Sequence, residues 1–269
     1  MRILILLSFS ILFTATLRAQ SYKSSLTFQK NLYSVATIQV PFEEDAVTAA
    51  IKDYMSRKGY KDAHYKDFIL FRSVPLDSSS SVVSDAYFNI SQKSHSEKDL
   101  TLINLLPVKK GETLLPVNAG DSSLVNSSIA YLNSMRRDIL SYTTQQQILA
   151  EQKTLDKINA KLISLKNDSG DIAKKIRNYE SDLQQNKIDQ DKQTKVISNT
   201  ATGDQDGLAK AHKKMDKLMD SQTDYEKKIR NYKADLEENT KDRETQKALL
   251  DKETQSMAAL KQRHQDLKY

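Results

Sequence analysis

Proline is absent from the whole second part of this sequence, and that absence most constrains the fold. The chain has 269 residues and four prolines, of which the last is Pro116. Proline is the strongest helix breaker, because it lacks a backbone N–H and its ring clashes with the preceding turn. Residues 117–269 can therefore form long uninterrupted helices. The residues before Pro116 also hold all seven phenylalanines and follow a different pattern.

Apolar residues recur three and four positions apart on both sides of residues 200–207. This spacing is typical of the contact line of a coiled coil. The Gly and Asp residues within 200–207 suit a turn followed by a new helix N-cap. We therefore predict a helix at about 143–199, a turn at 200–207 and a helix at 208–268, packed as an antiparallel hairpin within one chain.

A six-residue motif, Lys-Lys-Ile-Arg-Asn-Tyr, is present in both predicted helices, at 174–179 and again at 227–232. Folding the chain back about residue 204 places the two copies side by side and antiparallel. Tyr179 is then expected opposite Ile229. An internal duplication of this kind would pack on itself.

Most residues of the predicted contact line are aliphatic or aromatic. They are Ile158, Leu162, Ile176, Tyr179, Leu183, Tyr225, Ile229, Tyr232, Leu236 and Leu250. Polar layers in such a line tend to fix the register of the helices. The residues expected to form them are Ser169, Asn186, Gln222 and Asn239. Leu155 and Leu165 would face the charged residues Glu253 and Arg243, so the line leaves room for a further helix or a second copy of the chain.

Residues 20–142 show the pattern of a small α+β head domain with a helix on an antiparallel sheet. The predicted order is β-α-β-β-β-α, with strands at 32–40, 68–74, 86–90 and 100–106, a helix from about 43 to 58, and a second helix from Asp121 or Ser122 to about Ile139. This order resembles small helix-on-sheet folds of the TBP-like or helix-grip kind. We expect the junction with the hairpin domain, residues 143–269, to lie between Ser141 and Gln147. Despite Gly170, we expect the first hairpin helix to be continuous.

The first 19 residues have the pattern of a secretory signal peptide: Met1-Arg2, an apolar stretch, and Ala19 before the expected cleavage site. An uncleaved anchor is the alternative, but an apolar stretch of about 15 residues is shorter than the ~20 that span a bilayer. We therefore expect an exported protein, periplasmic or extracellular, without a transmembrane segment after cleavage.

Composition excludes several functions. The chain has no cysteine, which excludes disulfides, Cys-ligated zinc and thiol catalysis. The formal charge of +6 includes Arg2 and Arg18, and the remaining charges are interspersed rather than clustered. A nucleic-acid-binding surface needs a clustered basic stripe, so we expect no nucleic-acid partner.

Motifs for enzymatic chemistry are also missing from the sequence. The four histidines are scattered singly, without the spacing of a metal site. Residues 204–207 resemble the middle of a calcium loop, but Lys213 stands where the last ligand, a Glu, belongs. Neither a G-x-S-x-G elbow nor a phosphate-binding loop occurs. We expect no catalytic residues, no metal and no cofactor.

The duplicated motif places Lys174, Lys175, Lys227 and Lys228 at mid-hairpin. They can form a docking patch, or they can be the solvated flank of the contact line. In architecture the hairpin is similar to those of periplasmic adaptor proteins of efflux and secretion systems. We therefore expect a non-enzymatic interaction protein whose hairpin docks onto or spaces an envelope or secreted partner. The alternative is a module that binds a small ligand in the head domain.

Overall fold

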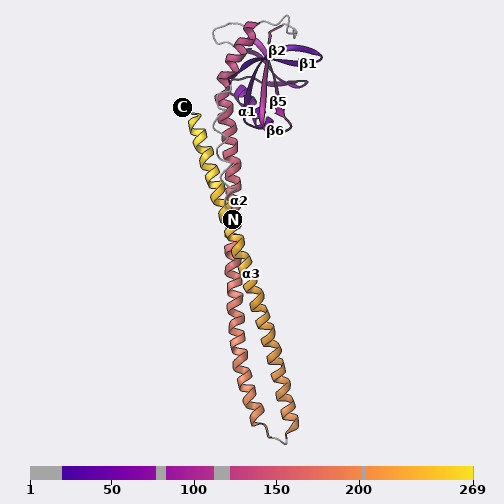
Figure 1. Ribbon diagram of the computed structural model, residues 1–269, viewed down its shortest axis with the longest axis vertical. Coiled ribbons are helices and arrows are strands. Elements are labelled where there is room, and N and C mark those ends of the chain that lie inside the picture. Colours follow the sequence, from indigo (N-terminus) through magenta and orange to yellow (C-terminus); the bar gives the residue numbers. More distant parts are fainter. Residues whose placement is uncertain (1–19, 77–82, 112–121, 202–203, 269) are drawn as a thin grey trace, which may run out of the picture. The chain divides into compact units, whose positions relative to one another are not determined.

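A computed structural model describes residues 20–76, 83–111, 122–201 and 204–268 (Figure 1). It confirms the α+β class, with a helix on a six-stranded antiparallel sheet in the N-terminal part and a long helical C-terminal part. The chain divides into two compact units. The head unit contains Met1–Leu149 and Ala259–Tyr269, and the hairpin unit contains Ala150–Ala258. The predicted signal peptide lies outside the described residues.

The sheet has the strand order β1-β2-β6-β5-β4-β3, and all neighbouring strands are antiparallel. The strands are β1 (Tyr22–Phe28), β2 (Asn31–Val40), β3 (Asp62–Tyr65), β4 (Phe68–Pro75), β5 (Val83–Ser94) and β6 (Glu97–Lys109). The helices are α1 (Glu44–Arg57), α2 (Ser122–Asn199) and α3 (Gln205–Asp266).

The core of the head unit lies between one face of the sheet and helices α1 and α2. Ile51 and Met55 of α1 and Leu132 and Met135 of α2 are fully buried there against strand residues such as Phe88. The helix α1 begins with Glu44 and Asp45, whose charges favour the positive end of a helix, as the sequence indicated. Gly59, with φ of +87°, closes the turn that follows its last residues.

The opposite sheet face carries a smaller aromatic cluster. Phe28 packs edge-on against Phe68, with ring centroids 4.9 Å apart, and also contacts Tyr65 at 6.4 Å. Phe28 ends the edge strand β1 and Tyr65 ends the other edge strand, β3. The sheet therefore curls until its two edges approach each other at this end, which lets aromatic side chains be buried without a covering helix.

The predicted strand order was wrong in omitting β1 and β3. The strand β1 contains Lys23, Ser24 and Ser25 and is mostly exposed, so it lacks a clean alternation of apolar and polar residues. The strand β3 has four residues and is exposed at three of them. Strand β6 also continues past its predicted end, through Pro107. Proline is accommodated there because the pairing of β6 with β2 ends at Leu105.

The two helices predicted on either side of the expected junction, Ser141 to Gln147, are in fact one helix of 78 residues, because α2 runs continuously through this segment. Neither Gly nor Pro occurs in it. Thr143 and Thr144 are buried, and each hydroxyl donates to the carbonyl four residues earlier. The apolar positions Ile139 and Ile148 are nine residues apart, which does not fit a strict heptad. The buried face of the helix therefore changes between them, while the helical backbone continues.

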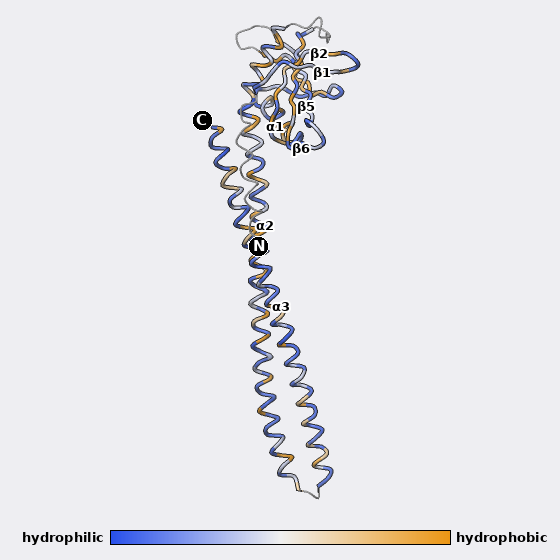
Figure 2. The backbone as a smooth tube through the Cα atoms, viewed as in Figure 1, coloured by the Kyte–Doolittle hydropathy of each residue, from blue (hydrophilic) through white to orange (hydrophobic). Residues whose placement is uncertain are grey.

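In the hairpin unit, α2 and α3 run antiparallel on either side of a short turn (Figure 1). The Asp204 side chain accepts a hydrogen bond from the Gly207 N–H at 2.8 Å and so caps α3, which begins three residues earlier than predicted. Most residues of the hairpin unit are hydrophilic (Figure 2). Along the described residues, no helix has an apolar stretch long enough to cross a membrane.

We predict that Leu132→Ala destabilises the head unit by about 2–5 kcal/mol, because it leaves a cavity at a fully buried position. Native-state hydrogen exchange of the β5 and β6 amides measures this loss. The matched control is Ile163→Ala on the same helix, where the side chain is 62% exposed and truncation should leave the exchange of these strands unchanged. Equal effects of the two substitutions would contradict the core assignment.

Candidate functional site

The two copies of the duplicated motif meet at mid-hairpin. The rings of Tyr179 and Tyr232 stack with centroids 5.8 Å apart and an interplanar angle of 13°. The Lys175 Nζ lies 5.3 Å from the Tyr232 ring centroid, and the Lys228 Nζ lies 5.2 Å from that of Tyr179. The second lysine of each copy therefore covers the tyrosine of the other copy. We call these four residues the tyrosine–lysine layer. Its reciprocal contacts relate the two copies of the motif by a local twofold axis.

Contacts across the hairpin define its register. Tyr179 contacts Tyr225 as well as Tyr232, which lie one helical turn to either side of Ile229, its expected partner. Nearer the turn, the Gln190 side-chain amide lies 3.5 Å from the Leu218 carbonyl oxygen. The Glu180 carboxylate pairs with the Lys233 Nζ at 3.0 Å. These pairs all belong to a fold-back centred close to residue 204.

Burial along the contact line is uneven. Among the ten predicted apolar residues, Ile158, Ile176 and Ile229 are buried. The others are only partly buried: Leu162, Tyr179, Leu183, Tyr225, Tyr232, Leu236 and Leu250. The line between α2 and α3 is therefore narrow, and seven of its ten predicted apolar side chains remain partly in contact with solvent.

A polar layer lies between the turn and the tyrosine–lysine layer. The Gln190 side-chain amide donates to Asn186 Oδ1 at 2.7 Å and to Gln222 Oε1 at 2.8 Å. Asn186 and Gln222 are two of the residues expected to form polar layers, and Gln190 joins them. Gln190 was not among the predicted layer residues, although it lies one heptad after Leu183.

The corresponding layer of the other repeat is less complete. Asn239 is buried, as its counterpart Asn186 is, whereas Ser169 is partly buried. Within the described residues, the Asn239 Oδ1 atom has no hydrogen-bond partner. A buried, unpaired amide oxygen costs about 1–3 kcal/mol, which weakens this part of the hairpin.

The four lysines of the expected docking patch divide into two pairs. Lys174 and Lys227 are exposed. Lys175 and Lys228 lie over tyrosine rings, and the Lys228 Nζ also pairs with Asp224 at 2.6 Å. That ion pair raises the pKa of Lys228, chiefly through its hydrogen bond. The second lysine of each copy thus takes part in the hairpin's own contacts, although Lys175 is also exposed and the Lys228 side chain remains 42% exposed.

Two carboxylates face each other near the base of the hairpin unit. Burial raises the pKa of Glu151, and a hydrogen bond with the Glu253 side chain raises it further. Lys252 lies 3.9 Å from Glu253 and counteracts this effect. Like charges in one place favour the protonated form of one partner. This layer therefore opposes the hairpin when both carboxylates are ionised.

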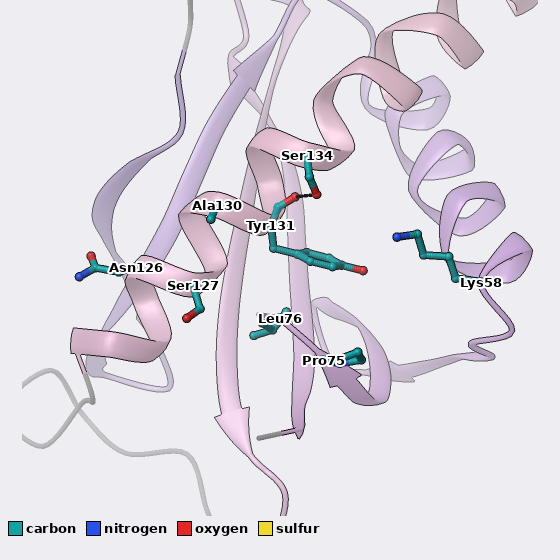
Figure 3. A pocket seen from close by; sticks show the side chains of 8 residues that line it. All are labelled: Lys58, Pro75, Leu76, Asn126, Ser127, Ala130, Tyr131 and Ser134. Carbon is teal, nitrogen blue, oxygen red and sulfur yellow. Dashed lines mark hydrogen bonds between the residues drawn. The ribbon is translucent and has the colours of Figure 1, made fainter. Parts of the chain in front are cut away.

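The head unit contains a cavity of about 680 Å³ between the end of α1, the end of β4 and the first turns of α2 (Figure 3). Its lining residues are Lys58, Pro75, Leu76, Asn126, Ser127, Ala130, Tyr131 and Ser134. The Tyr131 ring points towards Lys58 above Leu76 and Pro75 (Figure 3). Its hydroxyl donates to the Met55 sulfur at 3.3 Å, and burial raises its pKa. The cavity offers an apolar wall with one ammonium and several hydroxyl groups.

The histidines remain apart from one another and from acidic clusters. His64, His95 and His212 are exposed, whereas His264 is partly buried. Throughout the described parts of the chain, no three His, Cys, Asp or Glu residues are close enough to hold a metal ion.

Comparison with other proteins adds no candidate site: no protein-family model matches the sequence, and no curated protein is similar to it.

We predict that the hairpin becomes less stable as the pH rises above 4.5, the ordinary pKa of a glutamate. The folded state binds the Glu151 proton more tightly than the unfolded state, so this contribution is complete below that pKa and is lost as pH rises through the folded value. Glu151→Gln should therefore raise the melting temperature at pH 7 and reduce its pH dependence, followed by circular dichroism.

The matched control is Glu237→Gln. Glu237 is exposed and pairs with Lys241 at 2.7 Å, which lowers its pKa, so its substitution should not stabilise the protein at pH 7. If Glu151→Gln left both the melting temperature at pH 7 and the pH profile unchanged, the two glutamates would not be in contact.

Proposed function

We propose that this is an exported, non-enzymatic protein whose helical hairpin docks onto or spaces another envelope or secreted protein. The helix α3 has 62 residues, which corresponds to about 90 Å at 1.5 Å per residue. Its partner in the hairpin, α2, continues without interruption beyond the hairpin unit. Long paired helices with exposed outer faces suit the recognition of other helices or grooves.

The observation that carries this proposal is the narrow contact line of the hairpin. A hairpin that served only its own stability would gain from a wide apolar stripe on each helix. Here charged and amide side chains occupy most positions, and several apolar side chains are displayed outside the line. Ile163, Ile188, Val196 and Met219 are 62, 43, 51 and 56% exposed. These outer positions are available to a partner.

Shortening the hairpin tests the proposal. Deleting residues 183–196 together with residues 212–225 removes two heptads from each arm, keeps the heptad phase on both helices, and shortens the hairpin by about 21 Å. We expect the shortened chain to lose the proteins that the full chain labels in proximity labelling of its own cells. Retention of every labelled partner would refute both the docking and the spacing role.

A second candidate function, binding of a small ligand in the head unit, is favoured by the cavity beside Tyr131, whose volume is in the range of small-molecule sites. Ala130→Trp places a large side chain in this cavity while leaving the hairpin intact. If Ala130→Trp abolishes the biological function of the protein, and the hairpin deletion leaves that function intact, the head unit carries the function. The docking proposal expects the reverse result.

A further inference from the structure

A second concavity of the head unit, of about 410 Å³, lies between α2 and the last turns of α3. It is lined by Asn133, Arg136, Arg137 and Leu140 from α2 and by Arg263 and Asp266 from α3, with Leu267 beside them. Residues more than 120 positions apart in the chain thus bring three arginines to one small volume. We call it the arginine pocket.

Arg263 is the least compensated of these arginines. Its guanidinium lies 5.0 Å from the centroid of the Phe42 ring, and the side chain is only partly exposed. The Nε atom is buried and has no hydrogen-bond partner among the described residues. Burial lowers the pKa of this guanidinium. A desolvated charged donor is stabilised when an acceptor of opposite charge reaches it.

The residues around Arg263 leave the pocket accessible to a negatively charged acceptor. Arg137 donates from Nε to the Leu267 carbonyl oxygen, which orients its guanidinium at the junction of the two helices. Asp266 is the one carboxylate in the lining, and its Oδ1 accepts a hydrogen bond from Gln262 at 2.9 Å. Among the described residues of the lining, three arginines thus lie beside one aspartate.

We propose that the arginine pocket binds a small anion through a carboxylate or phosphate group. A guanidinium presents N–H donors in a planar fork that matches these groups, and such charge-assisted hydrogen bonds are stronger than neutral ones. The anion would join Arg136 and Arg137 of α2 to Arg263 of α3, and so hold the last turns of α3 against the core of the head unit. This site is additional to the docking function proposed above and does not depend on it.

The test is titration of the whole mature chain with inorganic phosphate and, separately, with acetate, at constant ionic strength maintained with sodium chloride. Isothermal titration calorimetry should show saturable binding of one ion per chain for at least one of the two, and the two titrations distinguish phosphate from carboxylate. Hydrogen exchange of residues 259–268 should slow on binding. Absence of saturable binding of both ions would overturn the proposal.

Substitutions assign the binding to the pocket. Arg263→Gln and Arg136→Gln should each weaken it by about tenfold or more, the scale of a lost hydrogen bond to a charged group. Arg263→Lys keeps the charge but not the fork, and should also weaken it. The matched control is Arg72→Gln, because the Arg72 side chain lies on the sheet and is 72% exposed. Equal affinities for the wild type and both glutamine variants, or equal weakening by Arg72→Gln, would refute the site.

Arg263→Gln also removes a contact with Phe42, so its folding must be measured. Circular dichroism of the unliganded variants gives this control. If Arg263→Gln unfolds the head unit, Arg136→Gln decides the matter alone: weaker binding by a folded Arg136→Gln chain supports the proposal, and unchanged binding overturns it.

Discussion

The stacking of Tyr179 on Tyr232, with a lysine over each ring, is the interaction on which the register of the hairpin depends. An aromatic pair contributes about 0.5–1.5 kcal/mol beyond its burial, and the lysine over each ring adds a cation–π attraction. Elsewhere the contact line contains amides, a buried unpaired oxygen on Asn239 and two facing glutamates. A slip of one heptad would leave Tyr179 beside only one of Tyr225 and Tyr232, and would move Lys228 away from the Tyr179 ring.

The duplication explains how one motif can supply both sides of this contact. In an antiparallel hairpin, two copies of a sequence face each other about a local twofold axis, so each copy serves as the surface and as its complement. This arrangement places the second lysine of each copy over a ring of the other copy, while Lys174, Lys175 and Lys227 remain exposed. The proposed docking role then falls to the outer faces of the helices. The proposed anion site belongs to the head unit, where the end of α3 packs beside α2.

The helical part of this fold could be predicted because its signals are local and repeated: an absence of proline, a heptad pattern and an Asp-containing turn. The strands β1 and β3 were missed because exposed edge strands do not alternate cleanly, and the continuity of α2 was missed because a change of buried face resembled a break. No local pattern joins Arg137 to Arg263. The arginine pocket depends on packing between distant segments, which periodicity cannot indicate.

The fold-back is tested most directly by a pair of cysteines, since the natural sequence has none. Gln190→Cys with Leu218→Cys places thiols at an in-register contact, whereas Gln190→Cys with Tyr225→Cys is displaced by one heptad. Under mild oxidation, the first pair should form a disulfide within one chain and the second should not, as seen by mass spectrometry of the separated monomer. A disulfide that joins two chains, or one that forms as readily in the displaced pair, would contradict the hairpin.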